Sequence, residues 1–240
     1  EYKEITWRDI ASHVQDILDG RFSLADMPDV AFFEERLIKE SVFRELAYHG
    51  VPDIRVVVYN KVPIMAMLRL PTRESKGKAN LHLGGIGVGI DIARGVTTYS
   101  IRRDSLLLQM QQYHGIKVPD WERILTLAIR AQTAIRLGYA GVDIVLAKNN
   151  GPVVLEVNAR PGLSIQVANL DGLKERLHRV RGLMVLGPED GIRLAKELFF
   201  VPHAPSTSTH LKVPVINVVE TVVLHHRSEA LLKIPVKAKV

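Results

Sequence analysis

The stretch Tyr139–Gly162, YAGVDIVLAKNNGPVVLEVNARPG, decides how the rest of this chain is interpreted. Its first half is β-branched and apolar, and so is the part that follows Asn149-Asn150-Gly151. Because an Asn-Gly pair between two such runs is a typical turn signal, the sequence predicts two strands joined by a tight turn. Arg160-Pro161-Gly162 ends the second strand.

Three polar residues interrupt these apolar strands. Glu156 and Asn158 stand two positions apart, so they point to the same face of their strand. Asp143 lies on the facing strand and meets them if its register points it the same way. Carboxylate and amide oxygens are ligands that suit Mg²⁺. The alternative is a solvated outer face of a hairpin, which we disfavour because a charge inside an apolar strand is costly without a partner.

The composition is that of an ordinary globular protein. The chain has 240 residues, of which 47% are hydrophobic and 24% charged, and it has no cysteine. Disulfides, thiolate zinc sites and a cysteine nucleophile are therefore excluded, and a cytoplasmic location is expected. No apolar run approaches the roughly 20 residues of a membrane helix. The net charge of +6 favours anionic ligands such as nucleotides, whereas a basic run with interleaved aromatic residues, typical of nucleic-acid binding, is absent.

A second hairpin is predicted over Asp53–Leu70, DIRVVVYNKVPIMAMLRL. Arg55 lies near the start of its first strand and Arg69 near the end of its second, both flanked by apolar residues. The guanidinium fork suits carboxylate or phosphate groups. A surface ion pair is the alternative, which we disfavour for Arg69 and weigh equally for Arg55.

The segment Ala79–Ile92, ANLHLGGIGVGIDI, is rich in glycine. It lacks a following Gly-Lys-Ser/Thr and a following helix, so it is neither a P-loop nor a Rossmann fingerprint. We expect a strand–turn–strand unit here, in which the glycines let the backbone approach a ligand or relieve the sheet. Asn80 and His82 alternate before them and are candidates for contact with phosphate or substrate. For His82 taken alone, an ordinary core or surface histidine is the favoured interpretation.

Helices are predicted from 3.6-residue periodicity at Ile5–Gly20, Pro119–Leu137 and Glu189–Phe199. Thr6 or Asp9 is expected to cap the first. Asp120 is expected to cap the second, with Ile135 on its buried stripe.

A buried strand that runs into a linker is predicted at Val30–Ile38. Glu34 and Glu35 at its end are either carboxylates available to a ribose hydroxyl or simply a charged strand end.

An oxygen-donor metal site beside arginines suits phosphoryl transfer, because the metal neutralises phosphate oxygens and arginine stabilises the transferred group. A two-carboxylate glycosidase is the less favoured alternative, since it needs an isolated carboxyl of raised pKa.

The quoted motifs resemble a known superfamily. GVDIVLA…GPVVLEVNARPG, the Asp53–Leu70 hairpin and the NLHLGG segment occur in the order found in ATP-grasp proteins, and in particular in the RimK-like, alpha-L-glutamate ligase-like branch. The resemblance covers about Val30–Leu198. It implies an α+β ATP-grasp fold in which antiparallel sheets with packed helices hold ATP. It also implies an ATP-dependent ligase that joins a carboxylate to an amine, with glutamate as the default amino acid of the branch.

The resemblance also implies roles for individual residues. Two Mg²⁺ ions, or Mn²⁺ in their place, would be held by Asp143, Glu156 and Asn158. The transferred phosphate or the acyl-phosphate would be contacted by Arg69 and Arg160. The adenine, the ribose and the phosphates of the nucleotide would be contacted by Glu34, Glu35, Glu40 and Asn80. The acceptor side would be lined by Asp53, Arg55 and His82.

The chain also departs from the family. The glycine-rich loop and the strand lysine that cover the ATP phosphates have no counterpart before Val30, and the chain begins at Glu1 without methionine. We therefore expect the amino-terminal lobe to be missing. Residues 1–200 are interpreted as a partial ATP-grasp region, 201–210 as a linker, and 211–240 as a β-hairpin or the start of a further domain. A non-catalytic nucleotide-binding or scaffold module and a small-molecule kinase are the alternative functions.

Overall fold

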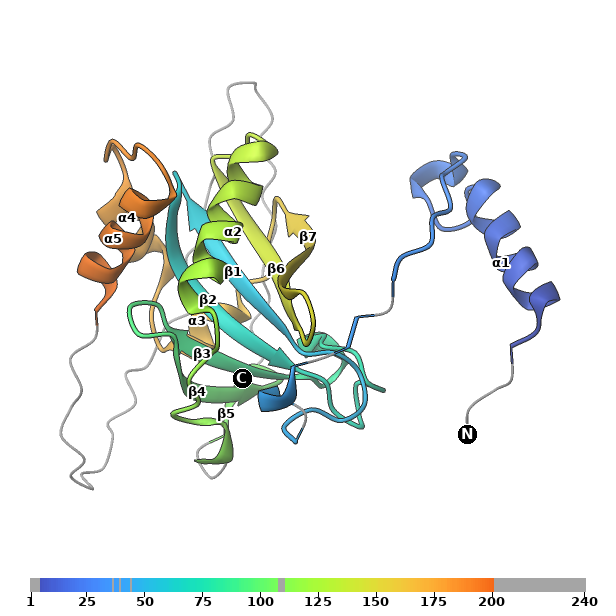
Figure 1. The fold of residues 1–240 in the computed structure, drawn as a ribbon, viewed down its shortest axis with the longest axis horizontal. Coiled ribbons are helices and arrows are strands. Elements are labelled where there is room, and N and C mark those ends of the chain that lie inside the picture. Colours follow the sequence, from blue (N-terminus) through green and yellow to red (C-terminus); the bar gives the residue numbers. More distant parts are fainter. Residues whose placement is uncertain (1–4, 36, 39, 44, 108–110, 201–240) are drawn as a thin grey trace, which may run out of the picture. The chain divides into compact units, whose positions relative to one another are not determined.

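The structure, a computed structural model, describes residues 5–35, 37–38, 40–43, 45–107 and 111–200 (Figure 1). The chain divides into two compact units, Glu1–Leu37 and Ile38–Val240. The predicted linker and hairpin at 201–240 lie outside the described residues. Within the described part, no helix has the length and apolar character needed to cross a membrane.

The first unit is built around helix α1, Trp7–Leu18, followed by the short 3-10 helix η1, Leu24–Asp26. The predicted cap is confirmed and is a reciprocal one. Thr6 Oγ1 accepts a hydrogen bond from Asp9 N at 3.3 Å, and Asp9 Oδ2 accepts one from Thr6 N at 2.8 Å. Among the described residues, α1 buries none of its side chains, so its apolar stripe is not part of a core here.

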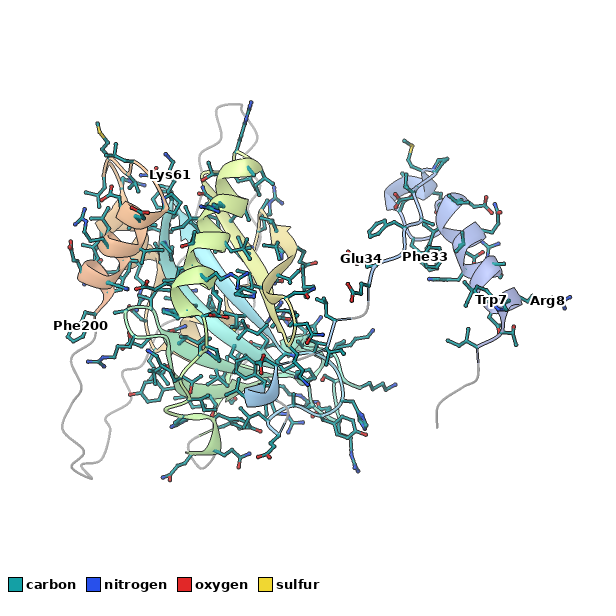
Figure 2. All side chains as sticks on the ribbon, in the orientation of Figure 1. Trp7, Arg8, Phe33, Glu34, Lys61 and Phe200 are labelled. Atoms are coloured by element: carbon teal, nitrogen blue, oxygen red, sulfur yellow. The ribbon has the colours of Figure 1, made fainter. Side chains whose placement is uncertain are left out.

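The predicted buried strand at Val30–Ile38 is wrong. The described residues of this segment form no strand, and Val30, Phe32 and Phe33 are 74%, 74% and 82% exposed. Figure 2 labels Phe33 and Glu34 on this extended stretch. An apolar run becomes a strand only where a partner satisfies its backbone, and no such partner lies within the described part of the first unit.

The second unit contains a seven-stranded sheet whose neighbouring strands are all antiparallel, in the order β5-β4-β3-β2-β1-β6-β7. The strands are β1 (Asp53–Tyr59), β2 (Val62–Leu70), β3 (Ile86–Asp91), β4 (Val96–Arg102), β5 (Ser105–Leu106), β6 (Tyr139–Ala147) and β7 (Gly151–Asn158). Both predicted hairpins are confirmed, and the α+β class with them.

Helices cover both faces of this sheet (Figure 1). The helices are η2 (Ser41–Phe43), η3 (Leu81–Leu83), η4 (Gln111–Tyr113), α2 (Trp121–Ala134), α3 (Ser164–Asn169), α4 (Leu173–Val180) and α5 (Pro188–Phe199). Helix α2 crosses one face of the sheet and packs against α5, whereas α3 lies against β2, β3 and β4 on the other. The core lies between these layers and the central strands, where Val56, Ile64 and Leu68 are fully buried.

Helix α2 departs from expectation at both ends. Asp120 occupies the N-cap position, but within the described residues its side chain makes no capping hydrogen bond, and its backbone is left-handed with φ of 52°. Ile135 is 43% exposed because the helix ends at Ala134 and Ile135 is already its C-cap. The buried indole of Trp121 instead anchors the start of the helix, since Nε1 donates to Ile92 O at 2.9 Å.

One glycine of β3, Gly89, allows a close backbone approach, which is made by helix α3, whereas the expected approach to a ligand stays a prediction. A Cβ on Gly89 would lie 2.2 Å from Ala168 O in α3. The backbone of α3 therefore rests directly on the sheet, and the segment after β7 that leads into α3 is held against the same face.

Candidate functional site

Register brings the predicted polar residues of three strands together. Arg55 on β1 pairs with Asp143 on β6, and Asp143 pairs with Glu156 on β7. Gly141 pairs with Asn158, two positions away. The register of β6 therefore points Asp143 to the face of Glu156 and Asn158, which was the condition that the sequence left open.

A β-bulge in the β6–β7 hairpin makes this arrangement compatible with a buried strand. The register shifts between Asp143 and Ile144, so that Ile144 pairs with Val154 and Leu155 is the extra residue. Because one extra residue reverses which side chains face the core, Val154 opposes the buried Ile144 while Glu156 opposes Asp143.

An open cavity of about 430 Å³ lies over this face of the sheet. Seven of the predicted site residues line it: Asp53, Arg55, Arg69, Asn80, His82, Asp143 and Glu156. Asn158 belongs to the same group, because its Nδ2 donates to Glu156 Oε1 at 2.9 Å and to Asp143 Oδ2 at 3.2 Å.

Two arginines and two aspartates form an ion-pair network on the floor of the cavity. Arg55 Nε and Nη2 donate to Asp143 Oδ1 and Oδ2, each at 2.7 Å. Arg69 Nη2 donates to the same Oδ2 at 2.7 Å, and its Nε donates to Asp53 Oδ1 at 2.5 Å. Paired charges of this kind are the usual condition for burying an ionised group.

The two aspartates have opposite pKa shifts. Burial raises the pKa of Asp53 to about 6, and the charge of Arg69 opposes this without reversing it. Burial also acts to raise the pKa of Asp143, but hydrogen bonds from Arg55 and the charge of Arg69 outweigh it, and that pKa lies below its ordinary value. Both aspartates are therefore mainly ionised at neutral pH, and Asp53 is the one that takes up a proton as the pH falls through 6.

The donor set fits a hard divalent cation. Asp143 and Glu156 supply carboxylate oxygens, and the amide of Asn158, whose Nδ2 donates to both carboxylates, can supply an oxygen if it turns over. In the described part of the chain no three His, Cys, Asp or Glu residues form such a cluster, so the site depends on the amide as well as the two carboxylates. Arginine N–H groups donate to both oxygens of Asp143. A cation that binds Asp143 therefore has to compete with these hydrogen bonds.

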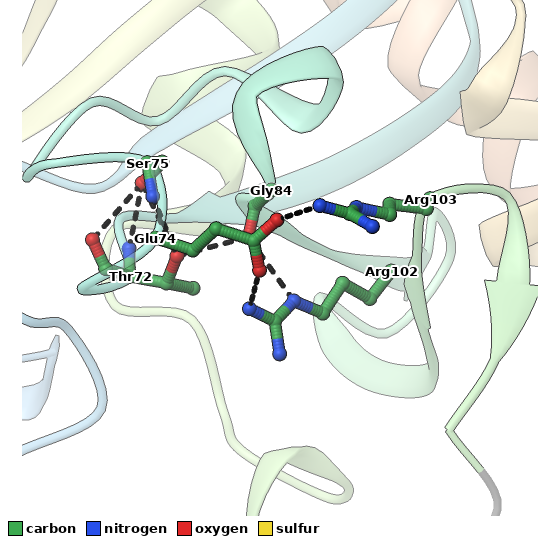
Figure 3. A network of polar contacts seen from close by, with 6 residues as sticks. All are labelled: Thr72, Glu74, Ser75, Gly84, Arg102 and Arg103. Carbon is green, nitrogen blue, oxygen red and sulfur yellow. Dashed lines mark hydrogen bonds and ion pairs between the residues drawn. The ribbon is translucent and has the colours of Figure 1, made fainter.

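Hydrogen bonds and ion pairs hold the loop that begins at Thr72, which lies next to the cavity wall with Asn80 and His82. Figure 3 shows Glu74 hydrogen-bonded to both Arg102 and Arg103. The carbonyl of Gly84, just after η3, accepts from Thr72 Oγ1 at 2.9 Å and from Arg102 Nε at 3.3 Å. The loop from Thr72 onward and the end of η3 are thereby tied to the end of β4.

Asn80 and His82 differ in how far their side chains are free to contact a ligand. Asn80 Oδ1 accepts from His82 N at 2.9 Å, so this side chain caps η3 as well as lining the cavity. His82 is exposed on the same wall.

Four predicted residues do not line this cavity. Glu34 and Glu35 are exposed in the first unit. Glu40 is half-buried, and its N donates to Leu146 O at 3.0 Å beside the end of β6. Arg160 is exposed after β7. Their nucleotide and phosphate roles stay predictions.

Sequence reasoning missed several contributors. Met67, Leu155 and Ser164 also line the cavity, and Glu74 acts through the loop. Met67 stands two positions before Arg69 on β2, so spacing alone could have placed it on the same face, whereas Leu155 depends on a bulge and Glu74 on contacts distant in sequence.

The geometry agrees with the comparison to known proteins. Residues 1–182 match the family of sugar-transfer associated ATP-grasp proteins, which is more than half of the chain. The chain belongs to this ATP-grasp family. The antiparallel sheet with packed helices is accordingly an ATP-grasp fold, as the resemblance implied.

Individual relatives of this ATP-grasp chain include proteins named as ligases. A probable alpha-L-glutamate ligase of Sodalis glossinidius is 33% identical over 118 residues, 49% of this chain and 30% of that protein. A protein of the same name from Pseudomonas putida is 36% identical over 114 residues, 48% of this chain and 28% of that protein. The human N-acetylaspartylglutamate synthase A is 29% identical over 145 residues, 60% of this chain and 28% of that protein. The matched part thus spans less than a third of these relatives.

Proposed function

We propose that this chain is the ATP- and metal-binding region of a ligase that joins a carboxylate to an amine. One observation carries the proposal: oxygen donors from β6 and β7 and two arginines from β1 and β2 share one cavity. The names of the relatives support the reaction class and make glutamate or another amino acid the first substrate to test.

The reaction consists of two balanced steps. A carboxylate oxygen of the substrate attacks the γ-phosphorus of ATP and the bond to the β,γ-bridging oxygen breaks, which gives an acyl-phosphate and ADP. The amine nitrogen then attacks the acyl carbon, phosphate leaves, and the nitrogen loses a proton to form the amide.

The chain's own residues are suited to the first step. Arg69 is held at Nε by Asp53 and at Nη2 by Asp143, so its guanidinium is oriented before a substrate arrives. Such preorganised charge stabilises a phosphoryl group in transfer. Bound Mg²⁺, held by Asp143, Glu156 and Asn158, would neutralise phosphate oxygens.

The remaining residues take the roles that the resemblance implied. Arg160 is assigned to the phosphate or acyl-phosphate. The nucleotide is assigned to Glu34, Glu35, Glu40 and Asn80. The acceptor side is assigned to Asp53, Arg55 and His82. Mn²⁺ is expected to replace Mg²⁺.

The test measures ADP release and product mass together. The chain is incubated with ATP, Mg²⁺, a panel of amino acids and small carboxylates, and each product is identified by mass spectrometry. We expect ADP release that requires both a carboxylate and an amine, with an amide as product. A phosphorylated product without an amide would instead identify a kinase.

A non-catalytic nucleotide-binding module is the second candidate. It is favoured by the occupation of both Asp143 oxygens by arginine. This candidate predicts nucleotide binding without ADP release under any acceptor combination.

A further inference from the structure

Asp143 belongs to two groups of side chains at once. On one side, three guanidinium N–H groups from Arg55 and Arg69 donate to its oxygens, each at 2.7 Å. On the other, Asn158 Nδ2 lies 3.2 Å from its Oδ2 and links it to Glu156. The carboxylate is 1% exposed, so solvent offers it little alternative partner.

Most of these hydrogen bonds end on one oxygen of Asp143. Asp143 Oδ2 accepts from Arg55, Arg69 and Asn158, whereas a carboxylate oxygen has about two lone-pair positions. A cation that bound this oxygen would therefore have to displace at least one of these N–H donors.

The charges of the network are balanced as the structure stands. Two aspartates, Asp53 and Asp143, face two arginines, Arg55 and Arg69, and the arginine side chains are only 11% and 13% exposed. If a divalent cation took Asp143 as a ligand, the guanidinium charge that Asp143 now balances would be available to an anion in the cavity.

The two arginines differ in what would hold them after such a displacement. Arg69 keeps its hydrogen bond from Nε to Asp53 Oδ1, so only its outer edge would turn. Among the described residues, both side-chain hydrogen bonds of Arg55 end on Asp143. Its Nη1 lies 3.9 Å from the point where a Cβ on Gly162 would stand, at the cavity lining.

We propose that Asp143 exchanges its arginine partners for a divalent cation, and that this exchange releases Arg55 and the outer edge of Arg69 to bind a phosphate-type oxyanion. Cation and oxyanion then strengthen each other's binding, and by linkage they do so by the same factor. The identity of the cation ligands rests on the proposed function. The release of the arginines rests on the contacts described above.

The sharpest test uses calorimetric titration with inorganic pyrophosphate in EDTA, where no cation is present. The Asp143→Asn variant removes the charge that holds both arginines and keeps the side-chain shape. We expect it to bind pyrophosphate about tenfold more tightly than the unaltered chain, within the usual range of coupling between sites. Loss of a metal ligand would therefore increase anion affinity.

The matched control is Asp190→Asn. It also removes one carboxylate charge that is paired with an arginine, Arg193, but this pair lies on α5 outside the cavity lining. We expect its pyrophosphate affinity in EDTA to stay within about twofold of the unaltered chain, because an exposed ion pair contributes little. Equal affinities of the two variants would overturn the arginine release.

A measurement on the unaltered chain covers the case in which Asp143→Asn fails to fold, as judged by circular dichroism. Inorganic phosphate is titrated with and without saturating Mg²⁺. We expect affinity about tenfold higher with Mg²⁺, and loss of this difference in Glu156→Gln. Equal phosphate affinity in both conditions would overturn the coupling. Coupling without any amide product in the ADP-release assay would instead refute the ligase proposal and leave the exchange intact.

Discussion

Arg55 donates two hydrogen bonds of 2.7 Å to Asp143, one to each carboxylate oxygen, across the antiparallel pair of β1 and β6. The two side chains are 11% and 1% exposed. This bidentate pair connects the candidate site to the centre of the sheet, so changes to it should affect both stability and binding.

Replacing Arg55 by methionine should destabilise the second unit. The change leaves Asp143 with only Arg69 as a charged partner, and breaking a buried pair on one side costs about 3 kcal/mol. Denaturant unfolding monitored by circular dichroism measures this. The control is Arg193→Met on α5, whose partners Asp190 and Glu197 are on the same exposed helix, and we expect a much smaller change there. Equal losses of unfolding free energy in the two variants would show that the buried Arg55–Asp143 pair stabilises the chain no more than an exposed pair does.

The pH dependence of stability should show the contribution of Asp53. Its pKa is about 6 in the folded chain, above its unfolded value of 3.8, so the folded state binds the proton more tightly. This contribution to stability is fully present below pH 4 and is lost as the pH rises through 6. Between pH 4 and 7 the stability of the unaltered chain should fall relative to Asp53→Asn by up to about 3 kcal/mol.

Unfolding free energies of both proteins across this pH range supply the measurement. A difference between them that does not change with pH would contradict the raised pKa of Asp53. The lowered pKa of Asp143 acts in the opposite sense, since its contribution is lost only as the pH falls below its ordinary range, and it is common to both proteins.

The contact between α3 and the sheet should depend on Gly89. A Cβ there would lie 2.2 Å from Ala168 O, a backbone atom that moves only if α3 moves. We expect Gly89→Ala to lower the free energy of unfolding by about 2 kcal/mol, as overpacking does. Gly172→Ala is the matched control, because nothing lies within 4 Å of its Cβ position and its φ of −86° suits alanine. Thermal unfolding of the two variants decides whether α3 packs this closely.

The rate of ADP release should depend on Arg69 but not on Arg73, which lies four residues further along the chain. If ADP release is detected, Arg69→Met should lower its rate at least about a hundredfold, because a preorganised charge beside the transferred group is lost. Arg73→Met should leave the rate within about threefold, since Arg73 lies 5.4 Å over the Tyr48 ring and does not line the cavity. Similar rates for both variants would remove Arg69 from the proposed mechanism.

The sequence predicted much of the second unit because its signals are local. Runs of β-branched and apolar residues on either side of a turn specify the hairpins, and the spacing of Glu156 and Asn158 places both on one face. The meeting of Asp143 with them depends on register and on the bulge at Leu155, which no local pattern encodes. The pairing of Asp53 with Arg69 follows from the predicted hairpin register. The second hydrogen bond of Arg69, to Asp143, depends on a third strand, β6, whose position next to β1 the hairpin does not predict.

The failures have a common physical cause. Val30–Ile38 has the composition of a strand, but its described residues form no strand, and their one backbone–backbone hydrogen bond among the described residues is from Lys148 N to Ile38 O. Asp120 stands where a cap is expected, yet its left-handed backbone turns the carboxylate away from a capping geometry. In both places the tertiary surroundings overrode a correct local preference.

The most direct test of the central claim is calorimetric titration of this chain with a non-hydrolysable ATP analogue in Mg²⁺, alongside Glu156→Gln and alongside the unaltered chain in EDTA. The account predicts binding that requires Mg²⁺ and that Glu156→Gln weakens at least about tenfold, because one of the three oxygen donors loses its charge. Absence of binding by the unaltered chain, or binding that neither EDTA nor the variant changes, would contradict a metal–nucleotide site formed by Asp143, Glu156 and Asn158.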